Sequence, residues 1–119
     1  GARTLLVDRV QIELVLRNLI ANAFEAVAGL PPGKKGVTVS TRMLTGGRIL
    51  LRVADTGEGV SPLTRQRLFE PFSTNKATGM GIGLSICRAI AEAHEGSLAA
   101  TDSRHGEFDL VLPIEVADE

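Results

Sequence analysis

Four short motifs occur in one order along the 119 residues, and this order constrains the fold more than any single motif does. Amphipathic and alternating segments separate the motifs, so each motif can be assigned to a helix, to the end of a strand or to a loop. From the N-terminus they are Asn18-Leu-Ile-Ala-Asn22-Ala23, Asp55-Thr-Gly57-Glu-Gly59, Phe69-Glu-Pro-Phe72 and Gly79-Met-Gly81-Ile-Gly83.

The composition is typical of a single domain with an aliphatic core, and we treat residues 1–119 as one domain. Hydrophobic residues make up 44% of the chain but aromatic residues only 3%, which leaves little for stacking on bases. The net charge of −1 argues against general binding to nucleic acid or to an anionic membrane. Cys87 is the only cysteine, which excludes a disulfide within the chain and a cysteine metal cluster. The start at Gly1-Ala2-Arg3 suggests that the natural protein is longer.

The N-terminal part predicts a short strand followed by a long amphipathic helix. The apolar run Thr4–Val7 indicates an edge strand, and Asp8 can cap the helix that follows. The helix is predicted from Val10 to Ala28, and the prolines within Gly29–Gly33 end it. Its apolar residues recur at helical spacing and gather on one face, which comprises Ile12, Leu16, Leu19, Ile20, Ala23 and Val27.

The remaining elements are two strand pairs and two helical segments. In order they are strands Val37–Leu44 and Ile49–Ala54 around a Gly46-Gly47 turn, a helical turn Ser61–Phe69, a helix over Gly83–Glu95, and strands Leu98–Thr101 and Phe108–Leu112. This order predicts an α/β (α+β) two-layer sandwich, with a mixed sheet of about five strands and its helices packed on one face.

The first motif lies on the long helix, where Asn18 and Asn22 project from one side because they are four residues apart. At ~100° per residue, this side lies roughly opposite the apolar stripe. Asparagine is a poor helix former, so two of them within a helix indicate that their amide oxygens have a role. Such oxygens suit a hard cation such as Mg²⁺. The alternative is an ordinary solvated face.

The second motif places Asp55 at the end of an apolar strand. An ionised carboxylate only accepts hydrogen bonds, so it can receive the exocyclic amino group of adenine and would reject the 6-oxo group of guanine. Gly57 and Gly59 allow the backbone to approach a planar base closely. The alternative is an ordinary Asp-Gly turn.

The third and fourth motifs predict a loop that leads into the second helix. The glycines from Gly79 to Gly83 would expose backbone N–H groups at a helix N-terminus, which is a cradle for phosphate. The cluster is neither a Walker P-loop nor a dinucleotide fingerprint, and flexible loops have similar sequences. Lys76 could screen phosphate charge. Phe69 and Phe72 are expected to anchor the start of this loop to the core and to form its hinge.

Together the four motifs resemble the N, G1, F and G2 boxes of the catalytic and ATP-binding domain of two-component sensor histidine kinases. These belong to the GHKL superfamily, which includes gyrase B, Hsp90 and MutL. The resemblance covers nearly the whole chain. Within it, Asn22-Ala-Phe-Glu25-Ala26 and Gly79-Met-Gly-Ile-Gly-Leu-Ser85 resemble the nitrogen- and oxygen-sensing subgroup. The resemblance implies the Bergerat-type ATP-binding fold, with ATP and Mg²⁺ as cofactors.

The resemblance also implies a role for each matching residue. Asn22 would bind Mg²⁺, Asn18 would support the metal or the phosphates, and Asp55 would hold the adenine amino group. Asn18, Asn22 and Lys76 form the implied catalytic set. The implied nucleotide contacts are Asn22, Asp55, Gly57, Gly59, Thr74, Lys76, Gly79, Gly81, Ile82, Gly83 and Leu84.

Asn18 separates transfer from hydrolysis within this resemblance. Hydrolysing relatives carry a glutamate four residues before the metal-binding asparagine, and a neutral Asn18 cannot act as a general base. Transfer to a positioned histidine needs mainly orientation, metal and electrostatics. We therefore expect a protein-histidine kinase that is inactive in transfer as an isolated domain. The alternatives are a nucleotide-sensing or scaffolding module without transfer, and a GHKL-type ATPase; a serine-kinase anti-sigma factor is a close relative, but it too usually carries the missing glutamate.

The implied partners are the protein's own dimerisation and phosphoacceptor domain and, through it, a response regulator. We expect a monomer for the isolated domain and a homodimer for the full-length protein, with no nucleic acid and no direct membrane contact. The expected location is the cytoplasm, including the cytoplasmic part of a membrane-bound sensor. His94 and Cys87 are interpreted as structural and His105 as a turn residue.

Two positions depart from the family pattern. Glu95 stands where the family often has glycine, and His105-Gly106-Glu107-Phe108 replaces a late Gly-Thr-x-Phe. We expect both departures to affect only local turns and neither to touch the nucleotide contacts.

Overall fold

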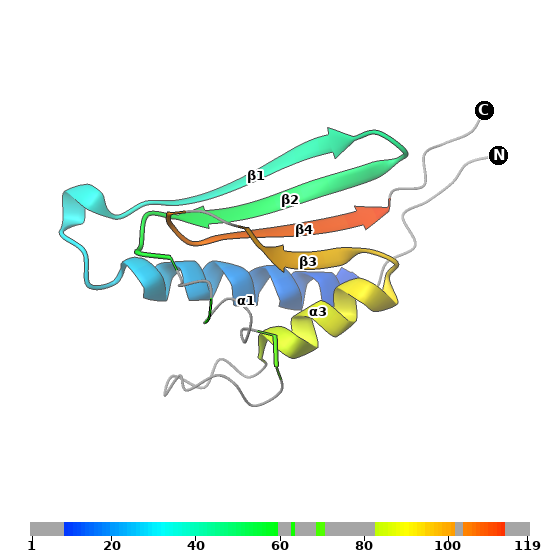
Figure 1. Ribbon diagram of the computed structural model, residues 1–119, viewed down its shortest axis with the longest axis horizontal. Coiled ribbons are helices and arrows are strands. Elements are labelled where there is room, and N and C mark those ends of the chain that lie inside the picture. The colour runs from blue at the N-terminus through cyan, green and yellow to red at the C-terminus, as the bar shows by residue number, and fades with distance from the viewer. Residues whose placement is uncertain (1–8, 60–62, 64–68, 71–82, 102–103, 114–119) are drawn as a thin grey trace.

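The computed structural model describes residues 9–59, 63, 69–70, 83–101 and 104–113. Its elements are α1 (Arg9–Val27), a short 3₁₀ helix η1 (Pro32–Lys34), β1 (Val37–Leu44), β2 (Arg48–Asp55), α3 (Leu84–Ala93), β3 (Ser97–Ala100) and β4 (Glu107–Pro113) (Figure 1). The strand predicted over Thr4–Val7 and most of the helical turn predicted over Ser61–Phe69 lie outside the described residues.

The described sheet has four strands in the order β1-β2-β4-β3, and each neighbouring pair is antiparallel. The predicted two-layer α/β fold is confirmed, and four of the about five predicted strands are described; the fifth, Thr4–Val7, lies outside the described residues. The described strands form an antiparallel sheet and not the mixed sheet that was predicted, because β4 lies between β2 and β3. These two strands run in the same direction, as a crossover through α3 requires, but β4 keeps them from pairing.

The helices α1 and α3 cover one face of this sheet, which gives the two layers that the sequence predicted (Figure 1). Alternate residues of each strand point toward the helices and fill the core between the layers. This core is largely aliphatic, because the chain has few aromatic residues. It contains Val15 and Leu19 of α1, Val53 of β2, Cys87 and Ala91 of α3, Leu98 of β3, and Leu110 and Leu112 of β4.

The apolar stripe predicted on the first helix is confirmed. Ile12, Leu19, Ala23 and Val27 are buried, while Leu16 and Ile20 are half-buried against the same core. Val15 was absent from the predicted stripe, yet it is fully buried.

The end of α3 turns directly into β3. The N–H of Gly96 donates to the carbonyl of Ala91 over 2.8 Å, and Glu95 takes a left-handed conformation with φ of 62°. A Cβ on Gly96 would collide with the carbonyl oxygen of Val111. The chain thus passes close to β4 here. Glu95 occupies the kind of backbone position where glycine is the favoured residue, in keeping with the glycine that the resemblance led us to expect there.

Candidate functional site

Asp55 is the last residue of β2 and is only 9% exposed. Its Oδ1 accepts a hydrogen bond of 2.7 Å from the backbone N–H of Gly57. Its own N–H donates to the carbonyl of Gly106 over 2.9 Å. The carboxylate is therefore held at the end of the strand, and Oδ1 has already accepted one donor from the chain.

The two glycines after Asp55 let this loop pack closely against its neighbours. A Cβ on Gly57 would lie 2.8 Å from the carbonyl oxygen of Ala26, near the end of α1. Gly59 has a φ of 79°, and a Cβ there would lie 2.8 Å from the carbonyl oxygen of Arg104. The fold itself therefore requires glycine at both positions, because other backbone segments of the protein pass close to them. The sequence had suggested a different reason, which was the approach of a planar base.

Asn18 is buried, and the expectation that it lies on a side opposite the core is wrong. It is 5% exposed, and its Nδ2 donates to Sγ of Cys87 over 3.1 Å. The physical reason is that α3 packs across α1, which a helical projection of one helix cannot reveal. Burial raises the pKa of the Cys87 thiol, while the hydrogen bond from Asn18 opposes that shift. The prediction that Cys87 is a packing residue is confirmed.

The start of α3 presents backbone donors. Gly83 precedes the helix, and its carbonyl accepts from the N–H groups of Ile86 and Cys87 at 3.1 and 3.2 Å. The first N–H groups of a helix have no acceptor within it and carry the positive end of its dipole. Of the predicted phosphate-binding residues, Gly83 and Leu84 are described here. Thr74, Lys76, Gly79, Gly81 and Ile82 lie outside the described residues.

Phe69 is anchored between a strand and a helix, as the third motif predicted. Its ring meets that of Phe108 edge to face, with centroids 6.4 Å apart. The Arg88 guanidinium lies 4.3 Å from the centroid of the Phe69 ring, within the range of a cation–π contact. Phe72 lies outside the described residues.

The turn before β4 contacts the Asp55 loop, which the sequence did not indicate. Nδ1 of His105 lies 2.6 Å from the carbonyl oxygen of Gly57, and Gly106 contacts Asp55 through its backbone. The expectation that this departure from the family leaves the nucleotide contacts untouched is therefore wrong at the predicted adenine site. The cause is the sheet order, because β4 pairs with β2 and begins where β2 ends. His94 instead contacts the carbonyl of Ile90 at 2.7 Å, in keeping with a structural role.

Two contacts bring the described parts of three motifs together around α1. Gly57 of the second motif lies against Ala26, one turn beyond Asn22 of the first. Asn18, one turn before Asn22, contacts Cys87 in the first turn of the helix that follows the glycine cluster. Figure 1 shows the ends of α1 and β2 and the start of α3 directed toward the same end of the molecule.

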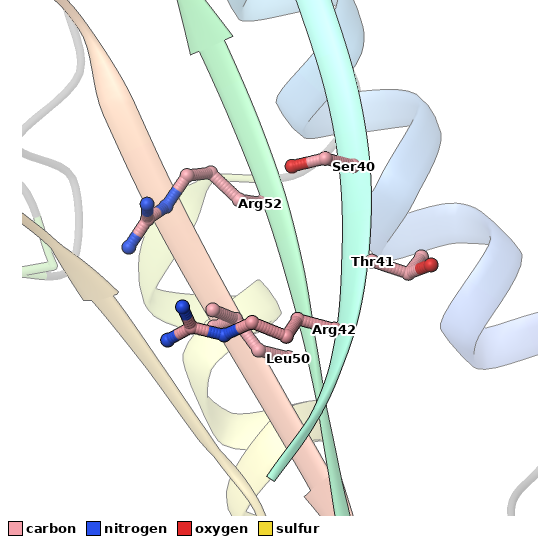
Figure 2. Close-up of a pocket in the computed structure, with 5 residues that line it drawn as sticks. All are labelled: Ser40, Thr41, Arg42, Leu50 and Arg52. Carbon is pink, nitrogen blue, oxygen red and sulfur yellow. The ribbon is translucent and has the colours of Figure 1, made fainter.

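A shallow hollow of about 200 Å³ lies elsewhere, among Ser40, Thr41, Arg42, Leu50 and Arg52 (Figure 2). Leu50 and Arg52 alternate with the core residue Val53, so they lie on the sheet face away from the helices. Arg52 binds both carboxylate oxygens of Asp109, at 2.7 and 2.9 Å, and this raises the pKa of Arg52. The hollow is therefore separate from the residues around α1.

The described residues contain no group of three or more histidine, cysteine, aspartate or glutamate side chains that could hold a metal ion. A divalent ion here would depend on amide and phosphate oxygens, as the predicted ligand Asn22 implies. Neither α-helix that the structure describes has both the length and the hydropathy of a membrane span.

Comparisons with known proteins agree with this architecture. The family profile described as histidine kinase-, DNA gyrase B-, and HSP90-like ATPase matches residues 7–116. The chain is 40% identical to the sensor protein FixL of Bradyrhizobium diazoefficiens over 119 residues, which are 100% of this chain and 23% of FixL. It is 39% identical to the sensor protein TdiS of Thauera aromatica over 109 residues, 89% of this chain and 20% of TdiS. The chain thus spans about a fifth of the length of these curated relatives.

Solved structures show the same fold. Full-length ShkA in complex with AMPPNP superposes with a TM-score of 0.77 at 30% identity, over 94% of this chain and 23% of ShkA. The catalytic domain of histidine kinase ThkA superposes with a TM-score of 0.77 at 29% identity, over 91% of this chain and 69% of that one.

Proposed function

Because this chain belongs to the histidine kinase-, DNA gyrase B-, and HSP90-like ATPase family, we propose that it is the catalytic ATP-binding domain of a sensor histidine kinase. In this proposal it binds ATP with Mg²⁺ and donates the γ-phosphate to a histidine on a separate dimerisation and phosphoacceptor domain. That domain then passes the phosphate to a response regulator. Residues 1–119 form the ATP-binding domain of this protein. The whole protein acts as a homodimer, and this domain lies in the cytoplasm, either free or as the cytoplasmic part of a membrane-bound sensor.

The observation that carries the proposal is the arrangement of three motifs around α1. The loop that would select the base packs on Ala26, and the helix that would receive the phosphates contacts Asn18. Asn22 lies one helical turn from each of these residues. A nucleotide whose base reaches the loop and whose phosphates reach α3 would therefore pass Asn22.

Asp55 suits adenine because of its charge and its fixed orientation. A carboxylate has about four acceptor positions, and the Gly57 N–H occupies one of them. The remaining capacity can accept the adenine amino group. The low exposure of Asp55 strengthens a hydrogen bond made there. Gly57 and Gly59 would line the base.

Asn22 is the proposed ligand of Mg²⁺. Its amide oxygen is a hard donor, and Mg²⁺ in nucleotide sites commonly keeps phosphate and water oxygens as its other ligands. The bound metal would neutralise charge on the phosphates. The backbone N–H groups at Gly83 and Leu84 would contact the same phosphates, together with Thr74, Lys76, Gly79, Gly81 and Ile82.

Asn18 supports transfer to a partner over hydrolysis. The side-chain amide of Asn18 is not basic, and its Nδ2 donates a hydrogen bond to Cys87 Sγ in the core. A residue in this state does not remove a proton from water. In this proposal the acceptor histidine lies on another domain. The contacts of His94 with the Ile90 carbonyl and of His105 with the Gly57 carbonyl support it, because both histidines are engaged within the fold.

Two other functions remain as alternatives. A nucleotide-sensing or scaffolding module would bind ATP without transferring phosphate. A GHKL-type ATPase would release phosphate by itself, and the neutral side chain of Asn18 disfavours it.

The pocket assignment is tested by measuring ATP binding to Asp55→Asn with excess Mg²⁺ by calorimetry. Loss of the charged acceptor should weaken binding about tenfold or more. Asp109→Asn is the matched control, since it changes a carboxylate that binds Arg52 on the other face of the sheet and should bind ATP normally. Equal affinity of Asp55→Asn and the parent protein would refute the pocket.

Transfer is tested by adding γ-labelled ATP and a histidine-bearing helical domain. The proposal predicts acid-labile label on that domain and slow phosphate release without it. ATP binding with no label on the helical domain would favour the scaffolding alternative. Rapid phosphate release by this domain alone would favour the ATPase.

A further inference from the structure

His105 joins the turn before β4 to the middle of the Asp55 loop, and the proposed nucleotide contacts do not account for it. Its Nδ1 lies 2.6 Å from the carbonyl oxygen of Gly57, across 48 residues of sequence. A carbonyl oxygen can only accept, so Nδ1 carries the proton in this contact. The contact is additional to the strand ladder, which ends at the pair of Ala54 and Glu107.

Gly57 connects His105 with Asp55. Its carbonyl accepts from the imidazole, and its N–H donates to Asp55 Oδ1 over 2.7 Å. The same residue is pressed against the carbonyl of Ala26. Gly57 is therefore fixed on three sides, by the side chains of His105 and Asp55 and by the backbone of Ala26.

The neighbours of His105 reinforce this arrangement. The Gly106 carbonyl accepts from the Asp55 N–H over 2.9 Å, and a Cβ on Gly106 would collide with the Asp55 carboxylate. The carbonyl oxygen of Arg104 lies close to Gly59, since a Cβ on Gly59 would be 2.8 Å from it. Backbone contacts on both sides of His105 thus place its ring against the loop.

We infer that His105 is a positioning residue for base selection: through Gly57 it keeps the Asp55 carboxylate turned toward the position of the adenine amino group. The inference rests on the proposed function and deepens it. A residue that only stabilised the fold would affect all nucleotides equally. A residue that orients Asp55 affects only those that offer an amino group to it.

The experiment compares ATP with purine riboside triphosphate, which lacks the 6-amino group. The dissociation constants of both nucleotides are measured with Mg²⁺ for the parent protein and for His105→Ala. The parent should prefer ATP about tenfold. His105→Ala should bind ATP about 3- to 10-fold more weakly while binding the analogue within about twofold of the parent, so that the preference falls.

Two variants serve as controls. His105→Asn carries an amide N–H near the position of Nδ1, and it should restore most of the preference for ATP. His94→Ala removes a histidine whose Nδ1 also contacts a backbone carbonyl, at 2.7 Å from Ile90, and should leave both dissociation constants unchanged.

A second measurement needs no nucleotide. Hydrogen exchange of the Gly57 amide, which donates to Asp55, should be faster in His105→Ala than in the parent and in His94→Ala. This result keeps the inference testable if the variant loses some stability, because global unfolding would speed exchange throughout the core.

The outcomes separate the inference from the proposed function. Equal loss of affinity for both nucleotides in His105→Ala, or no loss for either, overturns the inference and leaves ATP binding standing. A parent protein that binds neither nucleotide overturns both.

Discussion

Asn18 Nδ2 donates a hydrogen bond to Cys87 Sγ over 3.1 Å, and both residues are buried. The contact joins the middle of α1 to the first turn of α3. A buried amide donor must have an acceptor, because leaving it without one costs the full desolvation free energy. The sulfur of Cys87 therefore has a role in the packing of the two helices and in the orientation of the Asn18 amide.

Cys87→Val should lower the free energy of unfolding by about 1–3 kcal/mol, because valine fills the space but cannot accept the hydrogen bond. Denaturant titration measures this change. Cys87→Ser, which keeps an acceptor, should cost less than Cys87→Val. In the double variant Asn18→Leu/Cys87→Val, the loss should be smaller than the sum of the single losses, since both polar partners are gone. Strict additivity would show that the two side chains are not coupled.

Gly57→Ala should displace the Asp55 loop, because the new Cβ would lie 2.8 Å from the Ala26 carbonyl oxygen. We expect weaker ATP binding, measured by calorimetry, together with a lower melting temperature. Gly33→Ala is the control, since a Cβ at Gly33 would meet no atom within 4 Å. An unchanged ATP affinity in Gly57→Ala would mean that the loop does not need its contact with α1.

Glu95→Gly should raise the free energy of unfolding by about 0.5–1 kcal/mol. Glycine removes the strain of a side chain at φ of 62°, roughly 1–2 kcal/mol, but loses more backbone entropy on folding. Glu92→Gly is the matched control, because Glu92 lies within α3 and glycine there should destabilise by about 1 kcal/mol. Opposite signs for two Glu→Gly changes three residues apart would show that backbone conformation decides the effect. Equal signs would contradict it.

Local features of the fold could be predicted from the sequence. The first helix was predicted over Val10–Ala28 and runs over Arg9–Val27, and the strand Val37–Leu44 has the predicted bounds. These succeeded because helical spacing and turn residues act over a few positions. The neighbour of each strand is set over longer distances. The insertion of β4 beside β2 was therefore missed, and with it the contact of His105 with Gly57.

The candidate site was also only partly predictable, because local patterns place the residues of a motif but not the distant segments that contact them. Asp55 stands at the end of its strand, as the apolar run before it indicated. The burial of Asn18 depends on how α3 crosses α1, which the spacing within one helix does not contain. Residues of one motif can be assigned from sequence, whereas the residues that support them come from distant segments.

The interior place of β4 has a consequence for synthesis on the ribosome. The β1–β2 hairpin is complete once Asp55 has emerged, but its inner neighbour is the last described strand, Glu107–Pro113. Until that segment leaves the exit tunnel, the nascent chain has a hairpin with an open edge, and Asp55 lacks its contact with Gly106. Under the proposed function, we therefore expect this domain to bind a nucleotide only after β4, the last described strand, has been inserted beside β2.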